Sequence, residues 1–127
     1  PSVRLMEIGG RTDDKVTIGC MDLLPVKLFD EILSHVEGIT EDYQLKAFWE
    51  GRLEVLEITV ESDTPDQDGM KKKIFDAIHN IAHDLWKNYS LKMLDLRVGI
   101  VSPRSLRGNN VKLNRFVDIR RQQEREL

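Results

Sequence analysis

The stretch YQLKAFWEGRLEVLEITVE, residues 43–61, decides the fold of this 127-residue chain. It consists of two extended runs, residues 43–50 and 52–61, on either side of a turn near Glu50 and Gly51. Apolar and polar residues alternate in the second run, which predicts one inward and one outward face. The inward set is Leu56, Ile58 and Val60, and the outward set is Glu57, Thr59 and Glu61. Residues 43–61 therefore predict a β-hairpin with one buried face.

Apolar residues repeat at helical spacing on both sides of this hairpin. A first helix is predicted to begin at Pro25 and stop at Gly38, because proline suits a first helical position and glycine a helix end. A second helix is predicted from about Met70 to Asn88, after a polar connection at residues 62–69. The core positions are Leu28, Phe29, Ile32, Leu33 and Val36 in the first helix, and Ile74, Ile78, Ile81 and Leu85 in the second.

Two further alternating runs complete the pattern, one at Val16–Met21 and one at Leu94–Ile100. The order βαββαβ predicts an α+β fold, a ferredoxin-like sandwich in which two helices cover one face of an antiparallel sheet. We place the domain core at residues 16–103. Residues 104–127 lack apolar periodicity, which indicates a basic loop and tail beyond the sheet.

Composition is that of a globular domain, with 40% apolar and 32% charged residues. The apolar runs are far shorter than the roughly 20 residues that span a bilayer, so we expect no membrane partner. A net charge of −3 gives no general reason to expect nucleic-acid binding. The start at Pro1 has neither an initiator Met nor a signal peptide, so we expect a piece of a longer polypeptide. A lone Cys20 excludes an intrachain disulfide and fits a cytoplasmic protein.

Positive residues outnumber negative ones near the end of the chain. Such a run favours either a solvated or locally paired surface or a contact with phosphate or another anion. Nucleic-acid binding through this tail is a third, weaker interpretation, which predicts steep salt dependence. The positive residues are Arg104, Arg107, Lys112, Arg115, Arg120, Arg121 and Arg125, against Asp118 and Glu124.

Two other residue types, histidine and cysteine, invite a catalytic or metal-binding interpretation. His79 and His83 are four apart, but they lack the glutamate of an HExxH motif and are predicted to lie opposite the core face. We expect a solvated pair and no metal. No histidine can be identified from the sequence as the base that would activate Cys20. A small apolar packing role is therefore favoured over a role as a nucleophile.

Four segments follow one another in an order that resembles a known family. They are Gly10-Arg11-Thr12-Asp13-Asp14, then Pro25, then Asp42-Tyr43-Gln44-Leu45, then Lys112-Leu113-Asn114-Arg115-Phe116-Val117-Asp118. Together they resemble the C-terminal domain of adenylate-forming ligases of the phenylacetate–CoA ligase family. The resemblance covers almost the whole chain.

This resemblance implies roles for six residues. Lys112 is the implied catalytic residue, which approaches the substrate carboxylate and the α-phosphate during adenylation. Asp13 is the implied hinge, in a hinge segment at residues 1–15. The implied cofactor-binding residues are Arg11 beside the ribose or phosphate of AMP, Gly19 and Cys20 in the loop that lines the pantetheine channel, and Arg115.

The same resemblance implies a mobile lid domain of an ATP-dependent, AMP-forming acid–CoA ligase. The implied cofactors are ATP or AMP and coenzyme A, with Mg²⁺ held by a missing N-terminal adenylation domain. That domain and an aryl or other carboxylic acid are the implied partners. We expect this chain alone to be inactive and to bind none of these cofactors.

The chain departs from the family pattern at Cys20, Asp22, Phe29 and Val111. These departures bear on coenzyme A more than on adenylation, and they favour an alternative within the family, a synthetase that adenylylates a deazaflavin coenzyme. A non-catalytic, small-molecule-binding regulatory domain of ferredoxin-like fold is an alternative from another class. It predicts a dimer with ligand at the interface.

Overall fold

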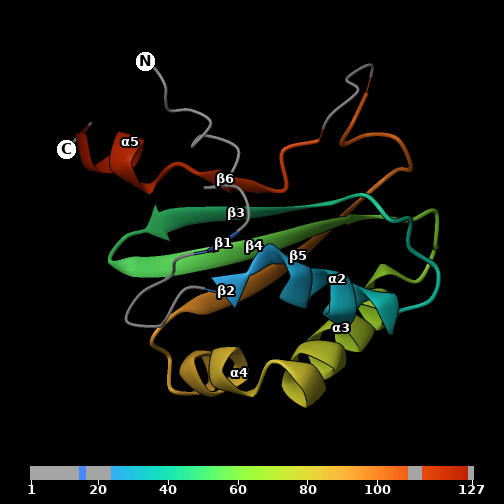
Figure 1. The fold of residues 1–127 in the computed structure, drawn as a ribbon, viewed down its shortest axis with the longest axis horizontal. Coiled ribbons are helices and arrows are strands. Elements are labelled where there is room, and N and C mark those ends of the chain that lie inside the picture. Colours follow the sequence, from blue (N-terminus) through green and yellow to red (C-terminus); the bar gives the residue numbers. More distant parts are fainter. Residues whose placement is uncertain (1–14, 17–23, 109–112, 126–127) are drawn as a thin grey trace.

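The computed structural model describes residues 15–16, 24–108 and 113–125. Within these ranges the main sheet has four strands in the order β5-β4-β3-β6. Helices α2, α3 and α4 lie on one face of the sheet (Figure 1), which confirms the α+β class. The strands are β3 (Tyr43–Glu50), β4 (Leu53–Glu61), β5 (Asp95–Val101) and β6 (Phe116–Asp118).

The predicted hairpin is confirmed almost residue for residue. Strands β3 and β4 are antiparallel, in a register that runs from Tyr43 opposite Val60 to Glu50 opposite Leu53. Gly51 has a φ of 64°, a backbone conformation that glycine adopts without steric cost. The turn chemistry and the alternation of apolar residues therefore agree on one register.

The sheet is mixed, not antiparallel as predicted. Strand β5 runs parallel to β4, and β6 runs parallel to β3. Strands β4 and β5 are joined through two helices, and such a crossover returns the chain in its original direction. A hairpin flanked by one parallel strand on each side is the result.

The helices lie where the sequence predicted them, but the second predicted helix is interrupted. Helix α2 (Val26–Ser34) lies where the first helix was predicted. The predicted second helix is two helices, α3 (Gln67–Ile81) and α4 (His83–Ser90), separated at Ala82 with φ −105° and ψ 72°. No Gly or Pro marks the break. Packing sets it, because Ala82 is 5% exposed and the bend brings Trp86 and Tyr89 against Phe75.

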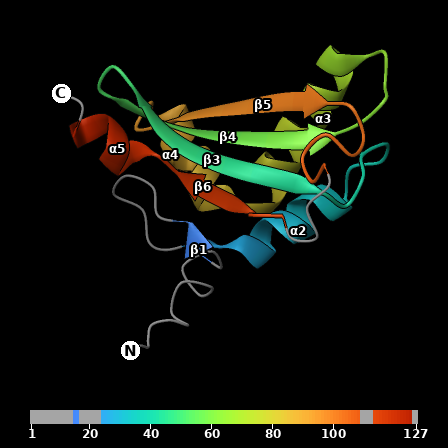
Figure 2. The same cartoon turned by 90° about the horizontal axis from the view of Figure 1, so that it is seen from above.

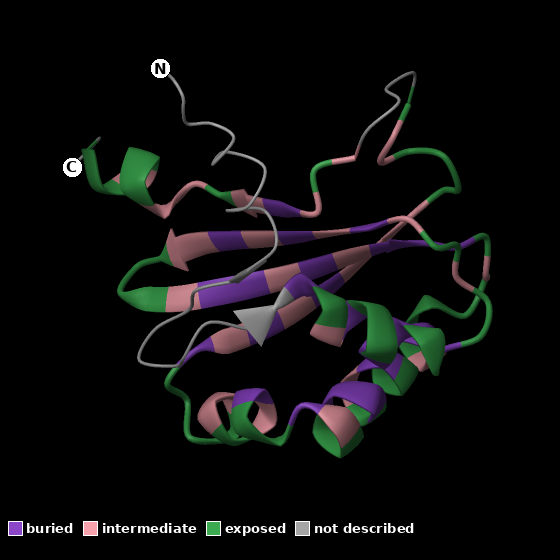
Figure 3. Cartoon of the chain, viewed as in Figure 1, coloured by how far each residue is buried: buried purple, intermediate pink, exposed green. Residues whose placement is uncertain are grey.

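A single apolar core fills the space between the sheet and these helices, and buried residues line the facing sides of both layers (Figure 3). Burial of such side chains supplies most of the driving force for folding. Its largest fully buried apolar members are Phe29, Ile32, Leu45, Leu56, Ile58, Ile74, Ile78 and Leu85.

The C-terminal segment extends the fold beyond the boundary that the sequence suggested. Strand β6 pairs with β3, with Phe116 opposite Leu45, and Phe116 is 9% exposed within the core. Helix α5 (Arg120–Arg125) follows at the same edge (Figure 2). Strand β6 has three residues, which is too short to show an alternation. The interpretation of residues 104–127 as a tail beyond the sheet was therefore wrong for this part.

The predicted first strand, Val16–Met21, is not a member of the main sheet in the residues that the structure describes. Strand β1 (Lys15–Val16) pairs with β2 (Leu24–Pro25) in a separate two-stranded sheet. Residues 17–23 lie outside the described residues. The edge of β3 is taken by β6 instead, so a segment from the far end of the chain closes the sheet.

Candidate functional site

Two segments, residues 102–108 and 113–115, stand on either side of residues 109–112, which lie outside the described part of the chain. Both segments are tied to the same corner of the fold, where β3 begins and β4 ends. We call these two segments the flanks. Their anchoring defines the candidate site, because predicted catalytic Lys112 comes between them in the sequence.

The first flank is anchored by a buried carboxylate. Glu61, the last residue of β4, is 1% exposed. One of its oxygens accepts a hydrogen bond from the backbone N–H of Leu106 at 2.9 Å, and the other accepts from the Thr40 hydroxyl at 2.8 Å. A buried charge is tolerated only when it is hydrogen-bonded in this way. The alternation of residues in β4 predicted that the Glu61 side chain would be exposed. This prediction was wrong, because the turn at residues 104–106 covers the side chain.

The hydrogen bonds determine the charge state of Glu61. Burial by itself raises the pKa of the carboxyl group. The backbone N–H groups of Leu106 and Arg104 and the hydroxyl of Thr40 outweigh burial, so the pKa lies below its ordinary value. Glu61 is therefore an anion at neutral pH, held by a concave set of N–H and O–H donors.

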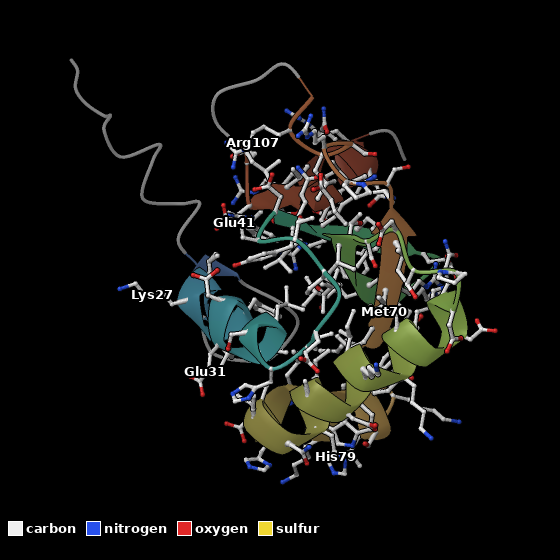
Figure 4. The ribbon with its side chains drawn as sticks, turned by 90° about the vertical axis from the view of Figure 1, so that its right-hand side faces the viewer. Lys27, Glu31, Glu41, Met70, His79 and Arg107 are labelled. Atoms are coloured by element: carbon white, nitrogen blue, oxygen red, sulfur yellow. The ribbon has the colours of Figure 1, made fainter. Side chains whose placement is uncertain are left out.

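A second contact reinforces the first flank. The guanidinium of Arg107 donates to the carboxylate of Asp42 at 2.9 Å. That hydrogen bond from Arg107 is the main reason why the pKa of Asp42 lies below its ordinary value. Arg107 and Glu41 lie together above the start of β3 (Figure 4), and Glu41 also attracts the guanidinium.

The second flank is anchored through Arg115 and its neighbours. The Arg115 guanidinium donates to the backbone carbonyls of Glu41 and Tyr43, at 3.2 Å and 3.1 Å, and lies over the Tyr43 ring at 4.4 Å from its centre. The Gln44 side chain donates to the carbonyl of Asn114 at 2.9 Å. Asp42, Tyr43 and Gln44, which carry part of the family resemblance, thus hold the flanks of residues 109–112.

Tyr43 in turn is fixed from the side of helix α2. Its hydroxyl donates to the Asp30 carboxylate at 2.5 Å. Burial, and then this hydrogen bond, raise the pKa of Tyr43 above its ordinary value, so the phenol stays protonated and the bond is kept. A groove of about 470 Å³ opens here, lined in part by Asp30, Glu41 and Arg115. With two carboxylates beside one guanidinium, this groove does not suit a phosphate.

Of the site residues implied by the family resemblance, only Arg115 lies within the part of the chain that the structure describes. Its contacts just given make it an anchor, and nucleotide binding by Arg115 stays a prediction. The remaining predicted residues lie outside the described residues, namely Arg11, Asp13, Gly19, Cys20 and Lys112.

Glu61 is the residue that sequence reasoning missed. It stands in the same alternating set as Glu57 and Thr59, and nothing in residues 53–61 separates it from them. Its burial depends on residues 104–106, which are more than 40 positions away in the sequence. No local signal was available to find it.

The histidines carry no metal site in the described part of the chain, where no group of three potential ligands occurs. His79 and His83 are exposed, and the break at Ala82 places them on different helices. The ring of His79 stacks on Trp86, with 4.8 Å between the ring centres.

Much of the basic tail is paired within the fold. Arg120 bridges to Glu54 at 2.6 Å and to Asp118 at 2.7 Å, with about one-eighth of the Arg120 side chain exposed (12%). Arg107, Arg115 and Arg120 thus attach the C-terminal segment to the rest of the fold. Across the described residues, no helix combines the length and apolar character that a membrane crossing requires.

Comparisons with known proteins were made for the whole chain. A search of curated proteins found no match. Among solved structures, the chain is similar to 2-hydroxyisobutyryl-CoA ligase in the postadenylation state, in its complexes with 2-HIB-AMP and with R3-HIB-AMP. Each match has 17% sequence identity and a TM-score of 0.48, and covers 90% of this chain and 24% of the ligase chain. The chain thus spans about a quarter of the length of those ligases.

A protein-family model matches most of the chain. The model is that of the AMP-binding enzyme C-terminal domain, and it matches residues 22–120. This range includes the hairpin, helices α2, α3 and α4, and both flanks. The chain therefore belongs to the AMP-binding enzyme C-terminal domain family, the family of C-terminal domains of adenylate-forming ligases.

Proposed function

We propose that this chain is the mobile C-terminal domain of an ATP-dependent, AMP-forming acid–CoA ligase similar to phenylacetate–CoA ligase. The family match over residues 22–120 carries the proposal. The anchoring of both flanks supports it, since a catalytic lysine needs a firm base close to the sheet. An N-terminal adenylation domain in the same polypeptide is the proposed partner, and it would supply the sites for ATP, Mg²⁺ and the acid.

The proposed reaction has two steps. In the first, a carboxylate oxygen of the acid attacks the α-phosphorus of ATP, which forms an acyl-adenylate and releases pyrophosphate. Negative charge grows on the α-phosphate, and the Lys112 ammonium group stabilises it. In the second, the thiol of coenzyme A loses its proton, attacks the acyl carbonyl, and expels AMP. Arg11 is the proposed contact to AMP, and Gly19 and Cys20 line the proposed channel for coenzyme A.

Turning the domain between the two steps explains why a separate mobile unit is useful. A closed domain keeps water from the acyl-adenylate, and two orientations supply different groups to two chemically different reactions. Asp13, in the segment that would connect to the adenylation domain, is the proposed hinge.

Lys112→Ala in the full-length polypeptide tests the proposal directly. Loss of one well-placed charge in a transition state lowers rates by about 10²–10³-fold, so pyrophosphate release in a single turnover should fall by that amount. Lys27→Ala is the matched control, because Lys27 is exposed on helix α2 (Figure 4) and should leave the rate unchanged. Wild-type adenylation in Lys112→Ala would contradict the proposal.

The product of the same assay identifies the acceptor. AMP together with a thioester supports the acid–CoA ligase. A stable nucleotidylated acceptor that survives without release of AMP supports instead a synthetase that adenylylates a deazaflavin coenzyme, the alternative that the residues around Cys20 favour.

A further inference from the structure

The backbone turn at residues 102–108 is held in an unusual conformation. Arg104 has a φ of 72°, in the left-handed region that side chains other than glycine rarely adopt. Two backbone hydrogen bonds close the turn, from Ser105 to the Ser102 carbonyl at 3.1 Å and from Gly108 to the Arg104 carbonyl at 3.0 Å. Such a conformation persists only where the surroundings fix it.

Glu61 supplies much of that constraint. Its carboxylate binds the N–H of Leu106, inside the turn, and the backbone of Arg104 also stabilises the anion. The same residue binds the 38–42 loop, through the Thr40 hydroxyl and through its own carbonyl, which accepts from the Thr40 N–H at 3.0 Å. One buried side chain thus joins the end of β4, the loop before β3 and the turn before residues 109–112.

We propose that Glu61 is a positioning residue for adenylation, which holds the turn at residues 104–106 as the base from which Lys112 acts. The inference rests on the proposed function of Lys112. Glu61 itself touches neither substrate nor nucleotide in this scheme. It acts through the backbone, and a misplacement of about 1 Å in a catalytic group is enough to lower a rate about 10²-fold.

The test is Glu61→Gln in the full-length polypeptide, with the two half-reactions measured separately. Glutamine keeps the size of the side chain but removes the charge that the N–H donors hold. We expect adenylation to fall about tenfold to hundredfold, while thioester formation from supplied acyl-adenylate changes by less than about twofold. Glu57→Gln is the matched control, on the same face of β4 but without the turn above it, and should leave both rates unchanged.

A double-mutant cycle shows whether Glu61 acts through Lys112. If it does, Glu61→Gln should lower adenylation by less than about twofold when Lys112 is already alanine. Hydrogen exchange at the Leu106 amide should become faster in Glu61→Gln, since its acceptor is weakened. Equal loss of both half-reactions, or an effect that multiplies fully with Lys112→Ala, would overturn the inference and leave Glu61 with a purely structural role.

The outcomes separate this inference from the proposed function. A silent Lys112→Ala defeats the proposed function, whereas a strong Lys112→Ala with a silent Glu61→Gln defeats only the inference. Should Glu61→Gln fail to fold, Asp42→Asn loosens the same turn through Arg107 and must show the same preference for adenylation. If Asp42→Asn slows adenylation and thioester formation equally, the inference also fails.

Discussion

Individual carboxylates at one corner of the sheet connect segments that are distant in sequence. Asp42 binds Arg107, and Glu61 binds the backbone of the turn that contains Arg107. Both carboxylates have lowered pKa values because donors surround the charged form. Ionisation of each carboxyl group therefore stabilises the folded state relative to the unfolded chain.

The pH dependence of stability follows from Asp42. Its folded pKa lies below the ordinary value of 3.8, so its contribution is complete above about pH 4 and is lost as the pH falls through the folded pKa. Asp42→Asn should be less stable than the wild type at neutral pH, and the difference should shrink in acid. Urea unfolding between about pH 2 and 7 measures this.

Asp63→Asn provides the comparison for this titration, because Asp63 is exposed in the connection after β4. At neutral pH its stability should lie within about 0.5 kcal/mol of that of the wild type, as is usual for substitutions at exposed positions. A gap between Asp42→Asn and the wild type that stays constant down to low pH would refute a charge-dependent role for Asp42.

At the scale of elements, strand β6 and helix α5 make the C-terminal segment part of the fold. Gln123 accepts from the Trp49 N–H at 2.6 Å and donates to the Trp49 carbonyl at 3.0 Å, so α5 continues the pairing of the β3 edge with a side chain. Phe116 packs into the core from β6. Both contacts hold the chain on the C-terminal side of the second flank.

Phe116→Ala should therefore destabilise the whole domain. Removal of a buried phenylalanine costs about 3 kcal/mol through lost apolar burial and the cavity that remains. Val117→Ala, at the next position and only partly buried, should cost about 1 kcal/mol or less. Urea unfolding followed by tryptophan fluorescence measures both. If both variants lost the same small amount, β6 would not belong to the cooperative unit.

For the whole molecule, the proposed function requires rotation about the segment that contains Asp13. Proline fixes φ and removes the backbone N–H, so Asp13→Pro should restrict that rotation. We expect the full-length variant to retain one half-reaction near the wild-type rate and to lose most of the other, by about tenfold or more. Separate assays of pyrophosphate release and thioester formation measure this.

A matched change nearby controls for general damage at this segment. Thr12→Ala replaces a neighbouring side chain without constraining φ, and both half-reactions should persist. If Asp13→Pro left both steps intact, or reduced them to the same degree, the hinge assignment would be wrong.

The sequence by itself determined the hairpin, helix α2, the place of the helices after it, and the family resemblance. These features depend on signals that are local: alternation within residues 43–61, a glycine at the turn, and apolar residues at helical spacing. Motif order along the chain is likewise readable without contacts. The family match over residues 22–120 bears out the coarser part of that resemblance.

Only the tertiary structure decided which strands are neighbours, where the second predicted helix breaks, and that the Glu61 side chain is buried. Strand β6 is too short to carry a periodic signal, and it joins β3 because the core accepts Phe116. Glu61 matches Glu57 in its local pattern, yet a turn from the other half of the chain buries it. Burial and pairing of this kind arise from contacts between distant segments, which no local window of sequence contains.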